Sequence, residues 1–157
     1  MKGDRKVLAT LNKLLADELT AINQYMVHSE MCANWSYDRL HQRLEKRAVD
    51  EMKHAEKLIA RILFLEGVPV VSRLNPIHIG ADVHRQFMAD AKSEQGAIGM
   101  YNAAIAEAGA AGDNGTREML EDILKDEEDH IDWLEAQLDQ IGQMKIENYL
   151  AEQVRGA

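Results

Sequence analysis

The sequence predicts an all-α protein: a four-helix bundle made of two antiparallel hairpins joined by a long crossover, followed by a short fifth helix. Three observations predict this fold class. Apolar residues recur at steps of three and four along four long segments, both prolines lie within residues 67–80, and short turn-like links separate the two segments of each half. The 157 residues are enough for one sizeable core, so we expect a single domain over residues 1–157.

The first two helices are expected between the N-terminus and residue 66. Their apolar stripes are spaced as one face of an α-helix, and each stripe includes one glutamate. The first stripe contains Leu8, Leu11, Leu15, Glu18, Ile22 and Tyr25, and the second contains Leu44, Ala48, Glu51, Ala55, Leu58, Ile62 and Leu65. The pattern is interrupted only near residues 35–38. Because this link is short, the two helices are predicted to form an antiparallel hairpin.

The stretch from Gly67 to Gly80 is predicted to be a loop because it contains Pro69 and Pro76, and proline interrupts a helix. It is long enough to run along a bundle and join the two hairpins. The next stripes contain Val83, Phe87, Asp90, Glu94, Ala97 and Tyr101, then Leu120, Ile123, Glu127, Ile131, Leu134, Leu138 and Ile141. Glycines between residues 109 and 115 suit a turn between these helices, and a short fifth helix is expected after Gly142.

The charge balance and cysteine content exclude several functions. The chain has 27 acidic against 18 basic residues and no block of lysine or arginine, so nucleic acid is not an expected partner. No run approaches the roughly 20 apolar residues of a membrane span, and the N-terminus lacks the apolar stretch of a signal peptide. We therefore expect a cytoplasmic protein with no membrane partner. Because Cys32 is the only cysteine, any metal must be held by carboxylates and imidazoles.

Four glutamates occupy stripe positions where a bundle helix normally carries an apolar residue. They are Glu18, Glu51, Glu94 and Glu127. A buried carboxylate without a partner costs several kcal/mol, so each one must be paired, protonated or bound to metal. The two acids of each half are 33 residues apart, and 76 residues separate the corresponding acids of the two halves. The chain therefore consists of two similar halves.

Each half also carries a histidine three residues after its second acid, in the motif Glu-x-x-His. Residues three apart share a helix face, so a glutamate and a histidine in this motif can reach one ion. A single pair arises easily by chance; the alternative for the doubled pattern is a charged bundle whose acids fall on seam positions by coincidence. The repeated register favours a metal site. We predict a dinuclear site whose ligands and catalytic groups are Glu18, Glu51, His54, Glu94, Glu127 and His130.

The ligand types indicate which metals suit the site. Four carboxylates and two imidazoles match the known di-iron or di-manganese pattern of four-helix bundles. Glu18 and Glu94, each alone on its helix, are expected to be terminal ligands, whereas Glu51 and Glu127 are better placed to bridge. Because negative charge stabilises Fe³⁺ more than Fe²⁺, we expect Fe²⁺ bound here to react readily with O₂ or H₂O₂.

Four further residues accompany the ligands in both halves. Asp50 and Asp126 precede the two motifs, and they are either acceptors of hydrogen bonds from the opposite histidines or solvated surface acids. Tyr25 and Tyr101 follow the acids of the partner helices by seven residues. A tyrosine on a core stripe is more often a packing residue than a hydrogen-bonding or redox group, and we interpret both in that way.

Four stretches closely resemble bacterioferritins over nearly the whole chain: MKGD, LNKLLADELTAINQY, DEMKHAEKLIARILFLEG and DEEDHIDWLEAQLDQIGQMKIENYL. The resemblance implies a ferritin-like fold and a homo-oligomeric shell of 24 subunits that stores ferric mineral. It also implies two iron ions per subunit at a ferroxidase centre that uses O₂ or H₂O₂, and a haem b shared by two subunits, with Met52 as its axial ligand. The implied reductant is an iron–sulphur ferredoxin.

One position departs from the family pattern. Some bacterioferritins have a histidine eight residues before the histidine of the first motif, which forms an inner-surface iron site with a nearby aspartate; the residue here is Lys46. Lys46 and Arg47 disfavour an extra iron beside Asp50 and favour a route for iron through the centre itself. Two alternative functions stay open: a di-iron or di-manganese peroxidase or oxygenase, and a haem-only electron-transfer bundle. The short chain, which has no added substrate domain, disfavours the first.

Overall fold

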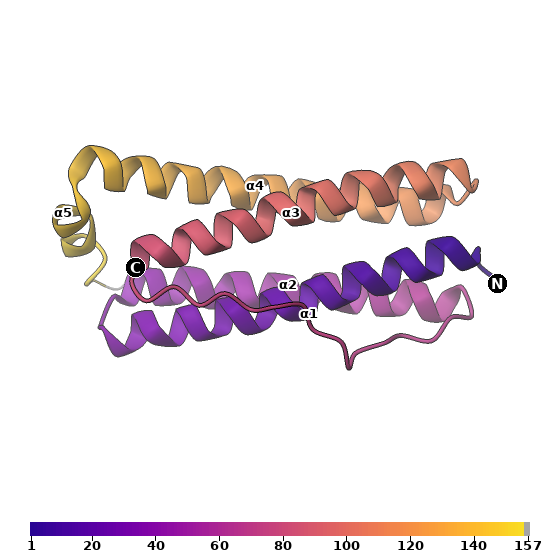
Figure 1. The fold of residues 1–157 in the computed structure, drawn as a ribbon, viewed down its shortest axis with the longest axis horizontal. Coiled ribbons are helices and arrows are strands. Elements are labelled where there is room, and N and C mark those ends of the chain that lie inside the picture. The colour runs from indigo at the N-terminus through magenta and orange to yellow at the C-terminus, as the bar shows by residue number, and fades with distance from the viewer. Residues whose placement is uncertain (156–157) are drawn as a thin grey trace.

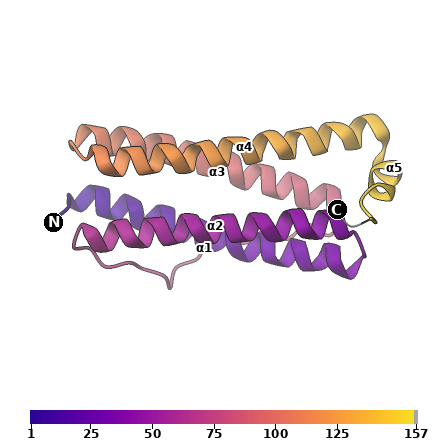
Figure 2. The ribbon, with the colours of Figure 1, turned by 180° about the vertical axis from the view of Figure 1, so that it is seen from behind.

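The computed structural model describes residues 1–155, and within that range it contains helices and no strand. The helices are α1 (Arg5–Asn34), α2 (Asp38–Phe64), α3 (Val83–Ala110), α4 (Asn114–Met144) and α5 (Ile146–Ala151). α1 packs antiparallel against α2 and α3 against α4, and the two hairpins lie along one another (Figures 1 and 2). The predicted four-helix bundle with a short fifth helix is therefore confirmed. No helix of residues 1–155 combines the length and the apolar character needed to cross a membrane.

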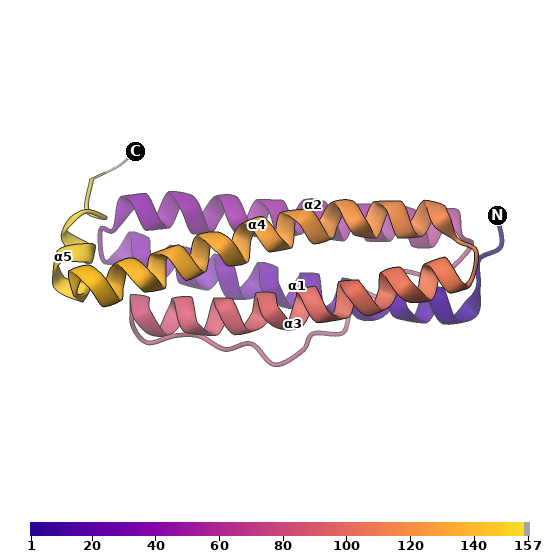
Figure 3. The same ribbon diagram turned by 90° about the horizontal axis from the view of Figure 1, so that it is seen from above.

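The predicted loop over residues 67–80 is confirmed as the crossover from α2 to α3, and it runs along α1 (Figures 1 and 3). Polar side chains of α1 accept hydrogen bonds from backbone amides of the crossover at 2.8 to 3.1 Å. The pairs, donor first, are Val70 with Asn12, Asn75 with Thr20, His78 with Gln24, and Gly80 with His28. A Cβ at Gly80 would lie 2.2 Å from the backbone nitrogen of Gln86, so only glycine fits there. These contacts fix the position of α3 along α1.

Short links close both hairpins, as predicted. Ser36 has φ 60° between α1 and α2, and Gly112 has φ 73° between α3 and α4; both values lie in the left-handed region that reverses a chain in few residues. The second link is shorter than expected, because α3 continues through Gly109 to Ala110. Gly142 likewise lies inside α4, which extends to Met144 before α5 begins. Single glycines are tolerated in helices that are held by packing.

Buried apolar side chains form two clusters, one toward each end of the bundle. The first includes Leu11, Leu15, Leu58, Ile62, Tyr101 and Ile123, and the second includes Tyr25, Cys32, Leu44, Phe87, Leu134 and Tyr149. On each long helix, the predicted glutamate lies in the segment between these two clusters. The polar centre is therefore separated from both ends of the bundle by apolar packing.

Candidate metal centre

The four predicted glutamates meet at the middle of the bundle, one from each long helix. Glu18, Glu51, Glu94 and Glu127 are each no more than 2% exposed. Because each lies on the apolar stripe of its own helix, packing the stripes together brings all four carboxylates to one place. The buried oxygens Glu18 Oε2 and Glu127 Oε1 have no hydrogen-bond partner among the described residues. A bound cation would satisfy such oxygens, so the donor set fits a metal.

One part of the centre is arranged as a site for a single cation. Ligand atoms of Glu18, Glu51, His54 and Glu127 all lie within 4.8 Å of one another. Nδ1 of His54 lies 3.2 Å from Glu51 Oε2 and 3.3 Å from Glu127 Oε1. The histidine therefore turns Nδ1 toward the carboxylates. The Glu-x-x-His geometry predicted for residues 51–54 thus brings glutamate and histidine together.

Glu94 and His130, the other two predicted ligands, do not belong to this group, and an arginine lies between them and the rest of the centre. Arg47 is 5% exposed, and its Nη2 lies 2.7 Å from Glu51 Oε1, 2.6 Å from Glu127 Oε2 and 3.4 Å from Glu94 Oε1. Glu94 and His130 are therefore outside the four-residue cation group. Sequence reasoning missed this role, although Arg47 precedes Glu51 by four residues and so shares its helix face.

Two tyrosines link the halves of the bundle through the ligands. The Tyr25 hydroxyl on α1 donates to Glu94 on α3, and the Tyr101 hydroxyl on α3 donates to Glu18 on α1. Nε2 of His130 also lies 3.1 Å from the Tyr25 hydroxyl. Our interpretation of both tyrosines as packing residues was incomplete: each is fully buried, and each also holds one carboxylate in place. The signal was their equal offset of seven residues from the acids.

The two aspartates that precede the motifs behave differently. Asp126 Oδ2 lies 3.0 Å from Nε2 of His54, which is the expected hydrogen bond to the opposite histidine. Asp50 instead pairs with Lys46 Nζ at 2.8 Å, so the two aspartates divide between the two alternatives: Asp126 is an acceptor for a histidine, and Asp50 is a surface acid. The physical reason is local: Lys46 lies one helical turn before Asp50 and supplies an opposite charge on the same face.

Burial sets the protonation of the centre. It raises the pKa of Glu18, Glu51 and Glu94, that of Glu51 to about 8, and repulsion between the carboxylates adds to the effect. Burial alone would lower the pKa of His54, but the carboxylates around Nδ1 outweigh it and raise that pKa well above its ordinary value. Burial and nearby basic groups lower the pKa of His130 to about 2. Without metal, His54 is therefore charged and His130 neutral.

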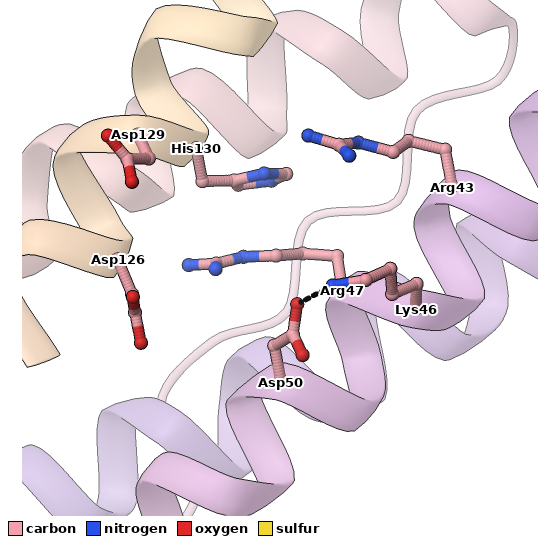
Figure 4. A pocket seen from close by; sticks show the side chains of 7 residues that line it. All are labelled: Arg43, Lys46, Arg47, Asp50, Asp126, Asp129 and His130. Carbon is pink, nitrogen blue, oxygen red and sulfur yellow. Dashed lines mark hydrogen bonds and ion pairs between the residues drawn. The ribbon is translucent and has the colours of Figure 1, made fainter.

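A cavity of about 290 Å³ opens beside the centre, between α2 and α4. It is lined by Arg43, Lys46, Arg47 and Asp50 of α2 and by Asp126, Asp129 and His130 of α4 (Figure 4). Figure 4 shows the Arg47 side chain extending from α2 toward α4, below the His130 ring. Since Arg47 and His130 also contact the glutamates, the cavity connects the centre with the surface of the chain.

The predicted haem ligand lies away from the glutamates. Met52 is on α2 and is 44% exposed, and Val49, on the same face three residues earlier, is 40% exposed. Met26 on α1, the helix packed against α2, is 49% exposed. An exposed thioether among other exposed apolar side chains suits an interface with a second chain. Met52 as a haem ligand stays a prediction.

Four antiparallel helices that each bury one glutamate, with two Glu-x-x-His motifs at the same level, define a ferritin-like metal-binding bundle. The comparison with protein families agrees with this class, because the ferritin model, described as a ferritin-like domain, matches residues 8–144.

Relatives make the assignment narrower. The chain is 41% identical over 152 residues to a bacterioferritin of Mycobacterium leprae (strain TN), covering 97% of this chain and 96% of the relative. It is 39% identical over 149 residues to a bacterioferritin of Brucella melitensis, with 95% and 92% covered. A bacterioferritin of Rhodobacter capsulatus is 39% identical over 138 residues, with 88% and 86% covered. The chain belongs to the bacterioferritin family.

Proposed function

We propose that this chain, as one domain over residues 1–157, is the subunit of an iron-storage shell that oxidises Fe²⁺ and deposits it as ferric mineral. The observation that carries the proposal is the group of four buried glutamates at the bundle centre, two of whose oxygens have no hydrogen-bond partner in residues 1–155. The name of its relatives supports iron as the cargo. A homo-oligomeric shell of 24 subunits in the cytoplasm is part of the same proposal.

The substrate of the proposed ferroxidase reaction is a pair of Fe²⁺ ions. Glu18 and His54, with Glu51 and Glu127, would hold one ion, and Glu94 and His130 would complete the ligands of the other. Each Fe²⁺ gives up one electron. O₂ takes both electrons with two protons to form H₂O₂, or H₂O₂ takes them with two protons to form two water molecules. The carboxylates favour the reaction because their charge stabilises Fe³⁺ more than Fe²⁺.

The histidines are prepared differently for metal binding. His130 is neutral because burial lowers its pKa to about 2, so a nitrogen lone pair is free for an ion. His54 carries a proton on Nδ1 in the metal-free protein, because the carboxylates around it raise its pKa. A metal ion at His54 must displace this proton, as metal binding to histidine generally does.

We propose Met52 as the axial ligand of a haem b shared by two copies of the chain. The exposed thioether of Met52 and the apolar side chains of Val49 and Met26 fit a haem held between two chains. Haem supplies a one-electron path for reducing stored Fe³⁺, with an iron–sulphur ferredoxin as the proposed reductant. In Met52→Leu we expect the absorption bands of methionine-ligated haem to disappear after reconstitution, whereas Met26→Leu should keep them. Unchanged bands in Met52→Leu would contradict the assignment.

The ion pair between Lys46 and Asp50 bears on how iron reaches the mineral. Lys46 Nζ lies 2.8 Å from Asp50 Oδ2, so the aspartate already has an opposite charge beside it and is less available to an extra iron ion. We propose that iron enters the shell through the centre itself, by way of the adjoining cavity. A Lys46→His variant should therefore need a different amount of iron per turnover during mineralisation. An identical requirement in the variant and the parent would contradict this route.

The proposed function is tested by Glu18→Ala, with Glu30→Ala, an exposed glutamate of the same helix, as control. Glu18→Ala should still assemble and bind haem, but Fe²⁺ oxidation in air should slow by more than about tenfold, because even loss of a residue behind a metal ligand costs that much. Unchanged oxidation would refute the centre. A large excess of Fe²⁺ given to the parent should yield particles with shell mass and high iron content. Monomers or dimers with two irons per chain would support the peroxidase or oxygenase alternative.

A further inference from the structure

A protein cation lies inside the carboxylate centre. Nη2 of Arg47 contacts three of the four glutamates, at 2.6 Å for Glu127, 2.7 Å for Glu51 and 3.4 Å for Glu94. These are the carboxylates that, together with His130, the second metal ion needs. The guanidinium therefore uses the same oxygens that the second ion would use.

Charge balance explains why an arginine is buried there. A buried ion without an opposite charge is strongly destabilising, and this holds for the carboxylates as well as for the guanidinium. Arginine keeps its charge in proteins, so Arg47 neutralises part of the centre in the absence of metal. Two divalent ions carry four positive charges, which match four carboxylates without any help from arginine. Once both ions are bound, the guanidinium becomes a third cation in the same space, and like charges repel.

The guanidinium is held mainly by these carboxylates. Its Nε is buried and has no hydrogen-bond partner among residues 1–155, so this donor does not anchor it. Arg47 also lines the cavity of about 290 Å³ between α2 and α4, where the carboxylates of Asp126 and Asp129 can receive a positive charge (Figure 4). The side chain thus has both room and acceptors outside the centre.

The second half of the chain has no equivalent cation. The residue 76 positions after Arg47 is Ile123, which is fully buried in the apolar cluster. The two halves therefore supply matching ligands, but only the first half has an arginine at this position, and the two metal positions are inequivalent. The position with Glu18 and His54 has no arginine in its place.

We propose that Arg47 is an internal substitute for the second metal ion, so that metal binds in order. The first divalent cation binds at Glu18, Glu51, His54 and Glu127. The second binds only as the Arg47 guanidinium moves out into the cavity, and its affinity is lower for that reason. The inference rests on the dinuclear centre proposed above and adds the order and the unequal affinities of its two positions.

Calorimetric titration of the assembled, metal-free protein with Zn²⁺, which does not change oxidation state, tests this order. The parent should bind one Zn²⁺ per chain tightly and a second at least about tenfold more weakly. In Arg47→Met the second affinity should approach the first, and the melting temperature should fall without metal but recover with saturating Zn²⁺. Arg47→Lys keeps a positive charge but has a shorter side chain and lacks the planar guanidinium, so it should substitute for the second metal ion less well and give an intermediate second affinity.

Arg43→Met is the matched control. Arg43 lines the same cavity one helical turn away, but its guanidinium lies over the Trp133 ring, 4.8 Å from the centroid. Because Arg43 acts on His130 only through its charge, Arg43→Met should change the second Zn²⁺ affinity far less than Arg47→Met does. Two equal Zn²⁺ affinities in the parent, or a second affinity that is the same in the parent, Arg47→Met and Arg47→Lys, would overturn the role of Arg47 while the centre stands. Tight Zn²⁺ binding that persists in Glu18→Ala would instead overturn the centre.

Discussion

Asp126→Asn tests how residues behind the ligands prepare the centre for metal. Asp126 Oδ2 lies 3.0 Å from Nε2 of His54, so Nε2 keeps its proton and Nδ1 is directed toward the carboxylates. Asparagine has nearly the same shape as aspartate but lacks the charge that favours this tautomer. We expect the variant to fold and assemble and to bind the first metal ion more weakly.

The structure sets the expected size of the effect. Loss of an acceptor behind a metal-binding histidine costs roughly 10–100-fold in metal affinity, or about 1.4–2.7 kcal/mol. The side chain of Asp126 is 54% exposed, so solvent screens its charge. The loss should therefore lie near the lower end of this range, at about tenfold.

Zn²⁺ titration calorimetry at one pH and ionic strength measures this loss directly. Asp50→Asn is the matched control, because Asp50 is the corresponding residue of the first half but pairs with Lys46 rather than with His130. Its loss of affinity should stay below about twofold, since such an exposed helix pair contributes only a few tenths of a kcal/mol. The reasoning is refuted if Asp126→Asn binds Zn²⁺ like the parent, or if both variants lose affinity equally.

Three further predictions concern the metal-free protein. Tyr25→Phe and Tyr101→Phe each remove a hydrogen bond to a buried glutamate and should lower the free energy of unfolding by about 1–3 kcal/mol in denaturant titrations. Burial raises the pKa of Glu51 to about 8, and the surrounding carboxylates raise that of His54, so the folded chain keeps protons that the unfolded chain loses; thermal melts should therefore show stability falling as pH rises from about 6.5 to about 8. Leu58→Ala removes a fully buried side chain and should cost about 2–5 kcal/mol in the same titrations.

Each of these expectations has a contrary result. Phenylalanine variants as stable as the parent would mean that the tyrosines serve only for packing. Stability that stays level or rises over this pH range would contradict the raised pKa values of Glu51 and His54. His130, whose pKa is lowered, opposes the trend only near pH 6.5, where the unfolded chain still binds part of its proton. Saturating Zn²⁺ should flatten the dependence. A loss below about 1 kcal/mol in Leu58→Ala would mean that the core collapses around the missing side chain.

Most of the fold could be predicted because its signals are local. A stripe at steps of three and four depends only on the helical period, and the crossover follows from the two prolines within residues 67–80. The ends of α3 and α4 were less well predicted, since Gly109 and Gly142 are held inside helices by packing that no single segment reveals. The polar contacts between α1 and the crossover also required the folded chain.

The candidate site divides in the same way. The equal spacings place the four glutamates at one level whatever the details of packing, so the buried acid cluster was predictable. The different partners of Asp50 and Asp126 were not, because a lysine one turn away competes with a histidine on another helix. The inward position of Arg47 was not predictable either: an arginine four residues before a glutamate usually forms an exposed pair on the helix surface.

By itself, then, the sequence determined the four helices, the repeated halves and the set of acids and histidines that face the bundle centre, since each depends on the order of residues along one helix. Only the tertiary structure decided which of these groups touch: that His54 joins three glutamates, that Tyr25 and Tyr101 reach across to the opposite helix, and that Arg47 lies among the ligands. The reason is geometric. Contacts across the bundle depend on how each helix is rotated about its axis and how closely it approaches its neighbours, and these are set by the packing of all four helices together.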